Sequence, residues 1–454
     1  MALVSINPSN QEVIDKYPVF SKAAVDLALV QAGKAFLEWR DTGFNFRRTC
    51  FMKCSEYLLD NKSKFASLIT KEMGKPITQS VSEIEKCAWV CEYYAVMAQD
   101  FLKDEHIESD ATESFVSYEP LGTIFAIMPW NFPFWQVFRF AAPALMAGNT
   151  AVLKHASNVP QCALAIEEVF KNSGFHDNVF QSLLINNDIV EDVIADPAIK
   201  AVTITGSEAA GSIVASTSGK HIKKTVLELG GSDPFIVLPD AEIDRAAQVA
   251  ADSRLLNSGQ SCIAAKRFIV VSSVFDEFLD SLKKYASEYV PANPLSPDAK
   301  LGPLAREDLV QSLLRQVDKS LEQGAVLTWG GGRPDLDGSF VNPAILTNVQ
   351  PGMPAWEEEL FGPVFSLIKV ESEEEAIRVA NDNRYGLGAS LWTSDMPKAI
   401  ELAKGIESGA VFINGLVKSD PRLPFGGIKK SGYGRELSTL GIKEFVNAKT
   451  VWIK

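Results

Sequence analysis

The spacing of hydrophobic positions divides the chain into a helical N-terminal part and a longer part in which strands and helices alternate. Over residues 21–103, apolar residues recur every three or four positions, a spacing that predicts amphipathic helices. A helix ending near Gly174 is also predicted over residues 159–174. From residue 114 onward, short apolar runs separated by turns predict buried strands at GTIFAIM (122–128), NTAVLK (149–154), FQSLLI (180–185) and AVTITG (201–206).

A second alternating unit follows Gly231. Its predicted strand PFIVL (234–238) precedes a helical pattern over residues 241–259 and another strand, KRFIVV (266–271). Strands that alternate with helices imply a parallel sheet covered on both faces, so the predicted fold class is α/β. The last segment, FVNAKTVWIK (445–454), alternates enough to form a terminal strand, and an exposed edge of that kind often pairs with another chain.

Composition and charge narrow the class of protein. A chain of 454 residues with 46% hydrophobic and 22% charged residues is predicted to fold into two or three domains. Its formal net charge of −13 argues against a nucleic-acid partner, because nucleic-acid-binding surfaces are basic. The most apolar region, residues 121–153, contains prolines, Asn131 and Arg139, so we expect a buried globular segment there and no membrane span.

The N-terminal residues and the cysteines bear on location and metal binding. Residues 1–20 lack the basic start and apolar core of a signal peptide, and six cysteines are few for this length, which favours a cytoplasmic protein. Two cysteine pairs, Cys50 with Cys54 and Cys87 with Cys91, have helical spacing. Stacked buried thiols explain that spacing better than metal ligation does, since no CxxC pair or nearby histidine accompanies them, and no metal site is predicted.

Candidate chemistry begins with Cys262 in NSGQSCIAAKR. A cysteine is nucleophilic only as the thiolate, and the histidine that usually activates it is not nearby, the closest upstream being His221. Glu228, in VLELGGSDP, is an ordinary turn residue when taken alone. Asn131, in PWNFP, is more informative because a buried amide needs a partner, and one aimed at a reacting carbonyl would stabilise an oxyanion.

These motifs together resemble the aldehyde dehydrogenase superfamily. The match spans nearly the whole chain, and the motifs occur in the family's order: PWNFP (129–133), LKHAS (153–157), ITGS (204–207), LELGG (227–231), NSGQSC (257–262), EELFGPV (358–364), PFGG (424–427) and SGYGRE (431–436).

The resemblance implies a covalent mechanism. By it, Cys262 is the nucleophile, Glu228 is the general base, and Asn131 with the Cys262 backbone N–H holds the oxyanion. A carboxylate can act as the base if partial burial raises its pKa toward neutrality. The implied cycle runs through a thiohemiacetal, hydride transfer to a nicotinamide cofactor, and a thioester that water hydrolyses, and it needs no metal.

The resemblance also implies a cofactor site. Lys154 would bind the adenine ribose, Glu359 the nicotinamide ribose, and Phe361 would lie beside the nicotinamide ring. Gly206 and Ser207 lie where a predicted strand meets a helix, a place where backbone N–H groups can bind a pyrophosphate, although a simple glycine turn explains them equally well without the resemblance. The remaining residues assigned to this site are Trp130, Gly211 and Leu229.

Ser157 departs from many NAD-preferring relatives, which carry a glutamate three residues after the Lys154 position. A carboxylate about 4 Å from a 2′-phosphate would cost on the order of 4 kcal/mol per charge pair at an effective dielectric near 20. Serine removes that repulsion and can donate a hydrogen bond. We therefore predict that NADP is the preferred cofactor and that NAD is also used.

The predicted substrate is an aldehyde with a distal carboxylate. Arg139 lies eight residues after Asn131, where relatives acting on apolar aldehydes often have a tryptophan. Its guanidinium would bind the carboxylate, the alternative being an arginine paired with an internal acid. Together with Ser419 it resembles the short bacterial succinate-semialdehyde dehydrogenases. The other residues assigned to the substrate site are Phe132, Trp135 and Phe425.

One mismatch leaves the substrate open. Some succinate-semialdehyde enzymes have a second arginine where this chain has Leu256, and the direction of the nearby Arg254 cannot be read from sequence. Glutarate semialdehyde or another short aldehyde therefore remains an alternative, as does release of the acyl group to CoA. A non-enzymatic cofactor-binding scaffold and a cysteine hydrolase are weaker alternatives, since nucleophile and base are both present and no Cys–His pair has local support.

The resemblance implies three structural parts and a homodimer or homotetramer. A doubly wound cofactor-binding domain would comprise residues 1–102 and 121–227, and an α/β catalytic domain residues 228–433. A small β oligomerisation element would combine residues 103–120 with 434–454.

Overall fold

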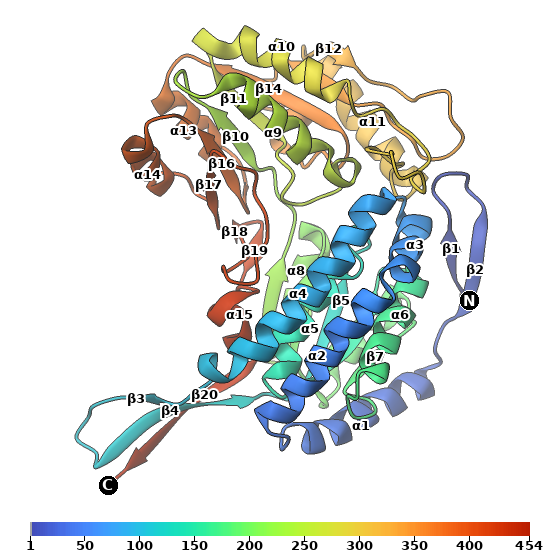
Figure 1. The fold of residues 1–454 in the computed structure, drawn as a ribbon, viewed down its shortest axis with the longest axis vertical. Helices are drawn as coiled ribbons and strands as arrows, with labels where there is room; N and C mark the ends of the chain where they lie inside the picture. The colour runs from blue at the N-terminus through green and yellow to red at the C-terminus, as the bar shows by residue number, and fades with distance from the viewer. Residues whose placement is uncertain (1) are drawn as a thin grey trace.

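The computed structural model describes residues 2–454 and begins with a hairpin followed by helices (Figure 1). The helices predicted over residues 21–103 are confirmed. They follow the hairpin strands in the order β1 (Ala2–Ile6), β2 (Val13–Pro18), α1 (Lys22–Trp39), α2 (Phe44–Asp60), α3 (Lys62–Met73) and α4 (Ile77–Phe101).

The helical cysteines are core residues, as predicted. Cys50 and Cys54 on α2 and Cys87 and Cys91 on α4 are all buried, and the Cys54 and Cys91 sulfurs are 3.8 Å apart. Burial raises the pKa of the Cys87 and Cys91 thiols far above the ordinary value, so these thiols stay protonated. They stabilise the α2–α4 contact as small apolar groups.

The first sheet is doubly wound, as predicted. Its strand order is β19-β9-β8-β5-β6-β7, in which β5 to β9 are parallel to one another and β19 pairs antiparallel with β9. Helices α1, α7 and α8 pack on one face, while α5 and α6 pack on the other. The elements are β5 (Thr123–Met128), α5 (Trp135–Met146), β6 (Thr150–His155), α6 (Pro160–Asn172), β7 (Phe180–Ser182), η1 (Asn187–Ile189), α7 (Val190–Ala195), β8 (Ile199–Thr205), α8 (Glu208–Lys220), β9 (Lys224–Glu228) and β19 (Gly432–Tyr433).

The strand order creates a crevice at the carboxyl ends of β5 and β8. These two strands are neighbours, but the chain proceeds from β5 toward β6 on one side and from β8 toward β9 on the other. Ligands bind at such a switch point in open α/β sheets. Trp130 and Asn131 follow β5, Ser157 follows β6, and Ser207 follows β8, so these predicted site residues meet at one edge of the sheet.

The second sheet has seven strands in the order β12-β13-β14-β11-β10-β16-β17, and only β12 is antiparallel to its neighbour among the pairs that residues 2–454 form in it. Helices α9 and α10 cover one face, and α11 to α14 cover the other. Its elements are β10 (Pro234–Val237), α9 (Ile243–Leu255), η2 (Leu256–Gly259), β11 (Arg267–Val271), η3 (Ser272–Val274), α10 (Phe275–Ala286), α11 (Glu307–Glu322), β12 (Val326–Gly330), β13 (Ala344–Thr347), α12 (Pro354–Glu357), β14 (Val364–Val370), α13 (Glu373–Asn381), β16 (Ala389–Trp392), α14 (Met396–Lys404) and β17 (Val411–Ile413).

A small sheet projects from the body of the molecule and carries the C-terminus (Figure 1). It has the order β20-β4-β3, with β3 (Glu105–His106), β4 (Glu113–Pro120) and β20 (Val446–Ile453). The predicted terminal strand is confirmed, and β20 lies at an edge. The remaining elements are the β15 (Tyr385–Gly386) and β18 (Ile428–Lys429) pair and α15 (Ser438–Lys443). None of the helices within residues 2–454 combines the length and the hydropathy needed to cross a membrane.

Candidate active site

The loop that carries Cys262 is held in an unusual backbone conformation. After α9, three successive residues have left-handed φ angles: Asn257 (51°), Ser258 (56°) and Gly259 (77°). A Cβ atom on Gly259 would lie 2.3 Å from the carbonyl oxygen of Gly362, so only glycine fits there. Such a conformation persists only where the surrounding structure enforces it.

Arg254 supplies much of that enforcement. Its buried guanidinium donates to the carbonyl oxygens of Ala265 at 3.0 Å, Gly259 at 2.7 Å and Leu360 at 3.0 Å. It therefore ties the Cys262 loop to the loop that contains Glu359. This settles the direction that the sequence left open, because these carbonyls occupy the guanidinium and keep it inside the protein.

Lys266 is a second buried cation beside Cys262. Its Nζ donates to the carbonyl oxygens of Ser261 at 2.9 Å and Cys262 at 2.7 Å, and it forms an ion pair with Glu359 at 3.2 Å. Sequence reasoning missed this residue, although the basic pair after the cysteine was visible. Lys266 links the backbone of Cys262 to a carboxylate that the resemblance assigns to the cofactor site.

The Cys262 thiol is protonated at neutral pH in this environment. Burial raises its pKa to about 12, although the charges of Arg139 and Lys266 act in the lowering direction. A nucleophilic role therefore requires a base or the charges that ligands bring.

Glu228 lies at the end of β9, and its side chain is surrounded by protein. The residue is 1% exposed, and its two carboxylate oxygens have no hydrogen-bond partner within the described chain. Burial, followed by the neighbouring Glu436, raises its pKa well above the ordinary value, while Arg139 opposes the rise. A carboxyl group with a raised pKa is a stronger base once deprotonated.

The amide of Asn131 is fixed against the Cys262 loop. Its Nδ2 donates to the carbonyl oxygen of Gln260 at 3.1 Å, and its own backbone carbonyl accepts from Asn257 Nδ2 at 2.7 Å. One N–H of the amide is used in this way, which leaves the second for a ligand. The structure thus brings Asn131 and the Cys262 loop together.

His155 ties the end of β6 to the loop that carries Asn131. Its Nε2 lies 2.9 Å from the carbonyl oxygen of Pro133, and its Nδ1 lies 3.2 Å from the carbonyl oxygen of Met128 and 2.9 Å from the backbone nitrogen of Ala156. Burial lowers the pKa of His155 to about 4, which keeps the ring neutral. The histidine of the LKHAS motif is a structural residue that sequence reasoning did not single out.

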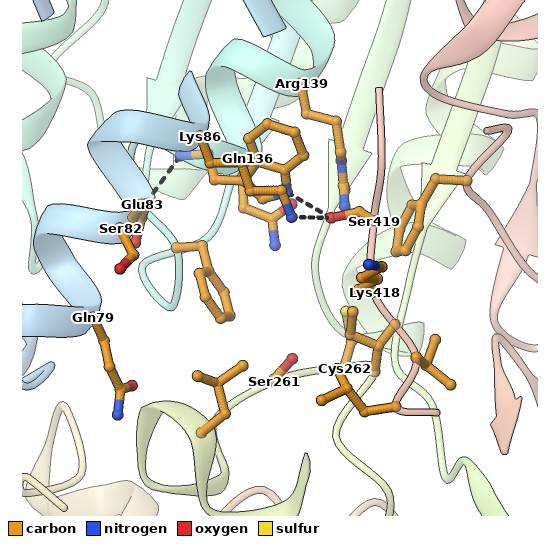
Figure 2. A pocket seen from close by; sticks show the side chains of 17 residues that line it. Gln79, Ser82, Glu83, Lys86, Gln136, Arg139, Ser261, Cys262, Lys418 and Ser419 are labelled. Carbon is orange, nitrogen blue, oxygen red and sulfur yellow. Dashed lines mark hydrogen bonds between the residues drawn. The ribbon is translucent and has the colours of Figure 1, made fainter. Parts of the chain in front are cut away.

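All five residues predicted for the substrate site line one pocket with Cys262 (Figure 2). The pocket has a volume of about 240 Å³, which suits a small substrate. Glu228 is not among its lining residues, so contact with the thiol requires rotation of its side chain or a bridging water. The five residues are Phe132, Trp135, Arg139, Ser419 and Phe425.

Arg139 both lines the pocket and pairs with an internal acid. Its guanidinium forms a buried ion pair with Glu436 and lies 4.4 Å from the centre of the Phe425 ring. The pairing is the alternative that the sequence left open, and it partly neutralises the charge that was predicted for the substrate. Lys86 of α4, which sequence reasoning missed, lines the same pocket.

The predicted cofactor residues lie along the crevice of the first sheet. Lys154 is 6% exposed and has no carboxylate partner within residues 2–454, while the neighbouring Ser157 is exposed. Ser207 caps the N-terminus of α8. A buried ammonium without a carboxylate partner and a helix N-terminus, both at the carboxyl edge of the first sheet, fit an anionic phosphate-bearing cofactor.

Packing accounts for the other residues predicted at this site. A Cβ atom on Gly211 would lie 2.5 Å from Leu229 Cδ2, so the glycine lets α8 approach Leu229 closely. Trp130 and Phe361 meet edge to face, with ring centres 5.8 Å apart. These contacts shape the crevice on both sides of the switch point.

Comparison with known proteins places this site in a family. The model of the aldehyde dehydrogenase family matches residues 2–451. The chain belongs to the aldehyde dehydrogenase family. A relative from Synechocystis, named as a probable NADP succinate-semialdehyde dehydrogenase, is 50% identical over 453 residues, covering 100% of both chains. A Mycobacterium bovis protein named as an NADP succinate-semialdehyde dehydrogenase is 44% identical over 456 residues, also covering 100% of both chains.

The aldehyde dehydrogenase fold is equally clear among solved structures. The succinic semialdehyde dehydrogenase of Streptococcus pyogenes, solved with NADP as the cofactor, superposes with a TM-score of 0.98 at 39% identity and covers 100% of both chains. The family resemblance and the fold class inferred from sequence are therefore confirmed.

Proposed function

We propose that this aldehyde dehydrogenase oxidises succinic semialdehyde to succinate with NADP. The observation that carries the proposal is the pocket in which Cys262 is joined by Arg139, Ser419 and a second cation, Lys86. A cationic, hydrogen-bonding wall around a nucleophile suits an aldehyde that also bears a carboxylate. The names of the two relatives and of the S. pyogenes structure support the same substrate and cofactor.

In the proposed first step, Glu228 removes the proton of Cys262, directly or through one water molecule. The Cys262 sulfur then attacks the aldehyde carbon and forms a C–S bond, and the carbonyl oxygen becomes an oxyanion. Asn131 Nδ2 and the backbone N–H of Cys262 stabilise this charge, a contribution of about 3–4 kcal/mol for one such donor.

Bound NADP supplies the acceptor for the hydride that leaves the former aldehyde carbon. The chain's own residues then complete the cycle. Glu228 first releases the Cys262 proton to solvent. It then takes a proton from a water molecule, the water oxygen attacks the thioester carbon, and the C–S bond breaks to release succinate and the Cys262 thiolate.

The residues proposed to hold the cofactor are Lys154 and Ser157 for the ribose phosphate, Ser207 at the start of α8 for the pyrophosphate, and Glu359 for the second ribose. The absence of a carboxylate beside Lys154 in the described chain supports NADP over NAD. We also propose a cytoplasmic enzyme, the three-part division given above, and a homodimer or homotetramer that uses the exposed edge of β20.

The test is steady-state formation of NADPH or NADH with succinic semialdehyde, glutarate semialdehyde and butanal. We expect the highest kcat/KM with succinic semialdehyde and NADP, and succinate as the product with or without CoA. Cys262→Ser, a matched replacement of sulfur by oxygen, should abolish turnover. A preference for butanal, or a CoA thioester as the product, would contradict the proposal.

A further inference from the structure

Lys86 carries a positive charge into the pocket and has no negatively charged partner among the described residues. It extends from α4 into the pocket, where its Nζ donates to Ser419 Oγ at 2.8 Å and lies 4.2 Å from the centre of the Trp135 ring (Figure 2). No carboxylate of residues 2–454 lies within ion-pair distance of it. A half-buried ammonium without a counter-charge is costly unless a ligand supplies one.

The nearby acids are already paired. Glu83, one helical turn before Lys86, forms a buried ion pair with Lys75 and accepts from the backbone N–H groups of Phe134 and Trp135. Asp420 is bound by Arg422 at 2.6 Å. Neither carboxylate is available to neutralise Lys86.

The other basic residues near the pocket are either bound to groups of the protein or exposed to solvent. Arg139 is paired with Glu436, and Arg254 is directed toward backbone carbonyls. Leu256 lines the pocket where some relatives were expected to have an arginine. Lys418 also lines the pocket, but its side chain is exposed to solvent.

Ser419 has a hydrogen that it does not use. A hydroxyl accepts two hydrogen bonds and donates one. Ser419 Oγ accepts from Lys86 Nζ at 2.8 Å and from Trp135 Nε1 at 3.1 Å, and it donates to no group within the described residues. Its O–H is therefore free to donate to a ligand in the pocket.

We propose that Lys86 and Ser419 form the binding site for the substrate's distal carboxylate, in which the Lys86 ammonium donates to one carboxylate oxygen and the Ser419 hydroxyl donates to the other. This inference rests on the proposed function and changes which residue is assigned to the substrate carboxylate. The main positive charge comes from Lys86 on α4, and Arg139 contributes less because it is already paired with Glu436. Lys86 thus supplies the positive charge that some relatives were expected to obtain from an arginine at the position of Leu256.

The charge of Lys86 is within reach of ordinary pH. Burial, helped by Arg139, lowers its pKa to about 8, while Cys87, Glu83 and Asp420 oppose the shift, and the Lys418 ammonium also faces the pocket. The ammonium is complete below that pKa and is lost above it. Binding of a carboxylated aldehyde should therefore weaken as the pH rises past about 8, and binding of a neutral aldehyde should not.

The experiment compares kcat/KM for succinic semialdehyde and for butanal in the wild-type enzyme, Lys86→Met, Lys86→Arg and Lys319→Met, with NADP saturating. Lys86→Met should lower the ratio of the two values by about 30-fold or more, mainly through KM for succinic semialdehyde. Lys86→Arg, which keeps the charge, should stay closer to wild type. Lys319→Met, the matched control with the same charge change in an exposed residue of α11 outside the pocket, should change the ratio by about 5-fold at most.

The pH dependence of the wild-type enzyme gives a second measurement that does not depend on whether a variant folds. The ratio should fall above about pH 8 in the wild type and stay level in Lys86→Arg, whose guanidinium does not titrate there. An unchanged ratio in Lys86→Met, an equal loss in Lys319→Met, or a level wild-type profile would overturn the inference and leave the proposed function standing. A wild-type enzyme that prefers butanal would instead overturn both.

Discussion

Ser157→Glu tests the cofactor preference most directly. Ser157 is exposed, and the nearby Lys154 ammonium is buried without a carboxylate partner. An introduced carboxylate would pair with Lys154, repel the 2′-phosphate of NADP and offer an acceptor to the ribose hydroxyls of NAD. All three effects change the preference in the same direction.

The exposure of Ser157 sets the magnitude. A pair of charges about 4 Å apart repels by about 4 kcal/mol at a dielectric near 20 but by only about 1 kcal/mol in water. Because the side chain at position 157 faces solvent, we expect the preference for NADP over NAD to fall by about 1.5–3 kcal/mol in total. The ratio of kcat/KM for NADP to that for NAD should then fall about 10- to 100-fold.

The assay is initial-rate kinetics with each cofactor at saturating aldehyde. Ser157→Gln is the matched control, since it adds nearly the same bulk without the charge, and it should change the ratio by less than about 3-fold. If the glutamine variant loses NADP preference as strongly as the glutamate variant, size and not charge governs the site, and the electrostatic reasoning is wrong.

Two further predictions concern the Cys262 loop. Lys266→Met should raise the pKa of the Cys262 thiol and slow its alkylation by iodoacetamide at a fixed pH. Lys283→Met, which removes a lysine far from the loop, is the control. Equal alkylation rates in the wild type and Lys266→Met would show that Lys266 does not stabilise the thiolate. Gly259→Ala should lower the free energy of unfolding in urea by about 2 kcal/mol or more, because φ is 77° and the added Cβ meets the Gly362 carbonyl. A loss below about 0.5 kcal/mol would mean that the loop relaxes freely.

The sequence predicted the order of helices and strands well because hydrophobic spacing reports directly on burial. It overestimated the length of β7, which ends at Ser182, since an apolar run does not distinguish a strand from the buried loop that follows it. The gathering of Phe132, Arg139 and Ser419 around Cys262 was inferred only through the family resemblance, because these residues lie on separate elements that meet through tertiary packing.

The contacts of the charged residues could not be predicted. Lys86 lies in an amphipathic helix, where a lysine normally faces solvent, and only the packing of α4 against the segment around Ser419 brings it into the pocket. The partner of Arg139 is Glu436, nearly three hundred positions later in the chain. The direction of Arg254 could not be predicted either, because it depends on carbonyl oxygens of two loops, and the spacing of residues in the sequence does not report on such contacts.

The guanidinium of Arg254 acts as a spacer between the Cys262 loop and the Glu359 loop, since a single planar group contacts backbone carbonyls of both loops. The wall that carries Lys86 is built from other elements, α4 and the segment around Ser419. Substrate choice and the geometry of hydride transfer therefore rest on separate pieces of the chain. A substitution of the charged residue on the pocket wall can therefore change which aldehyde is accepted, while the reacting atoms keep their positions.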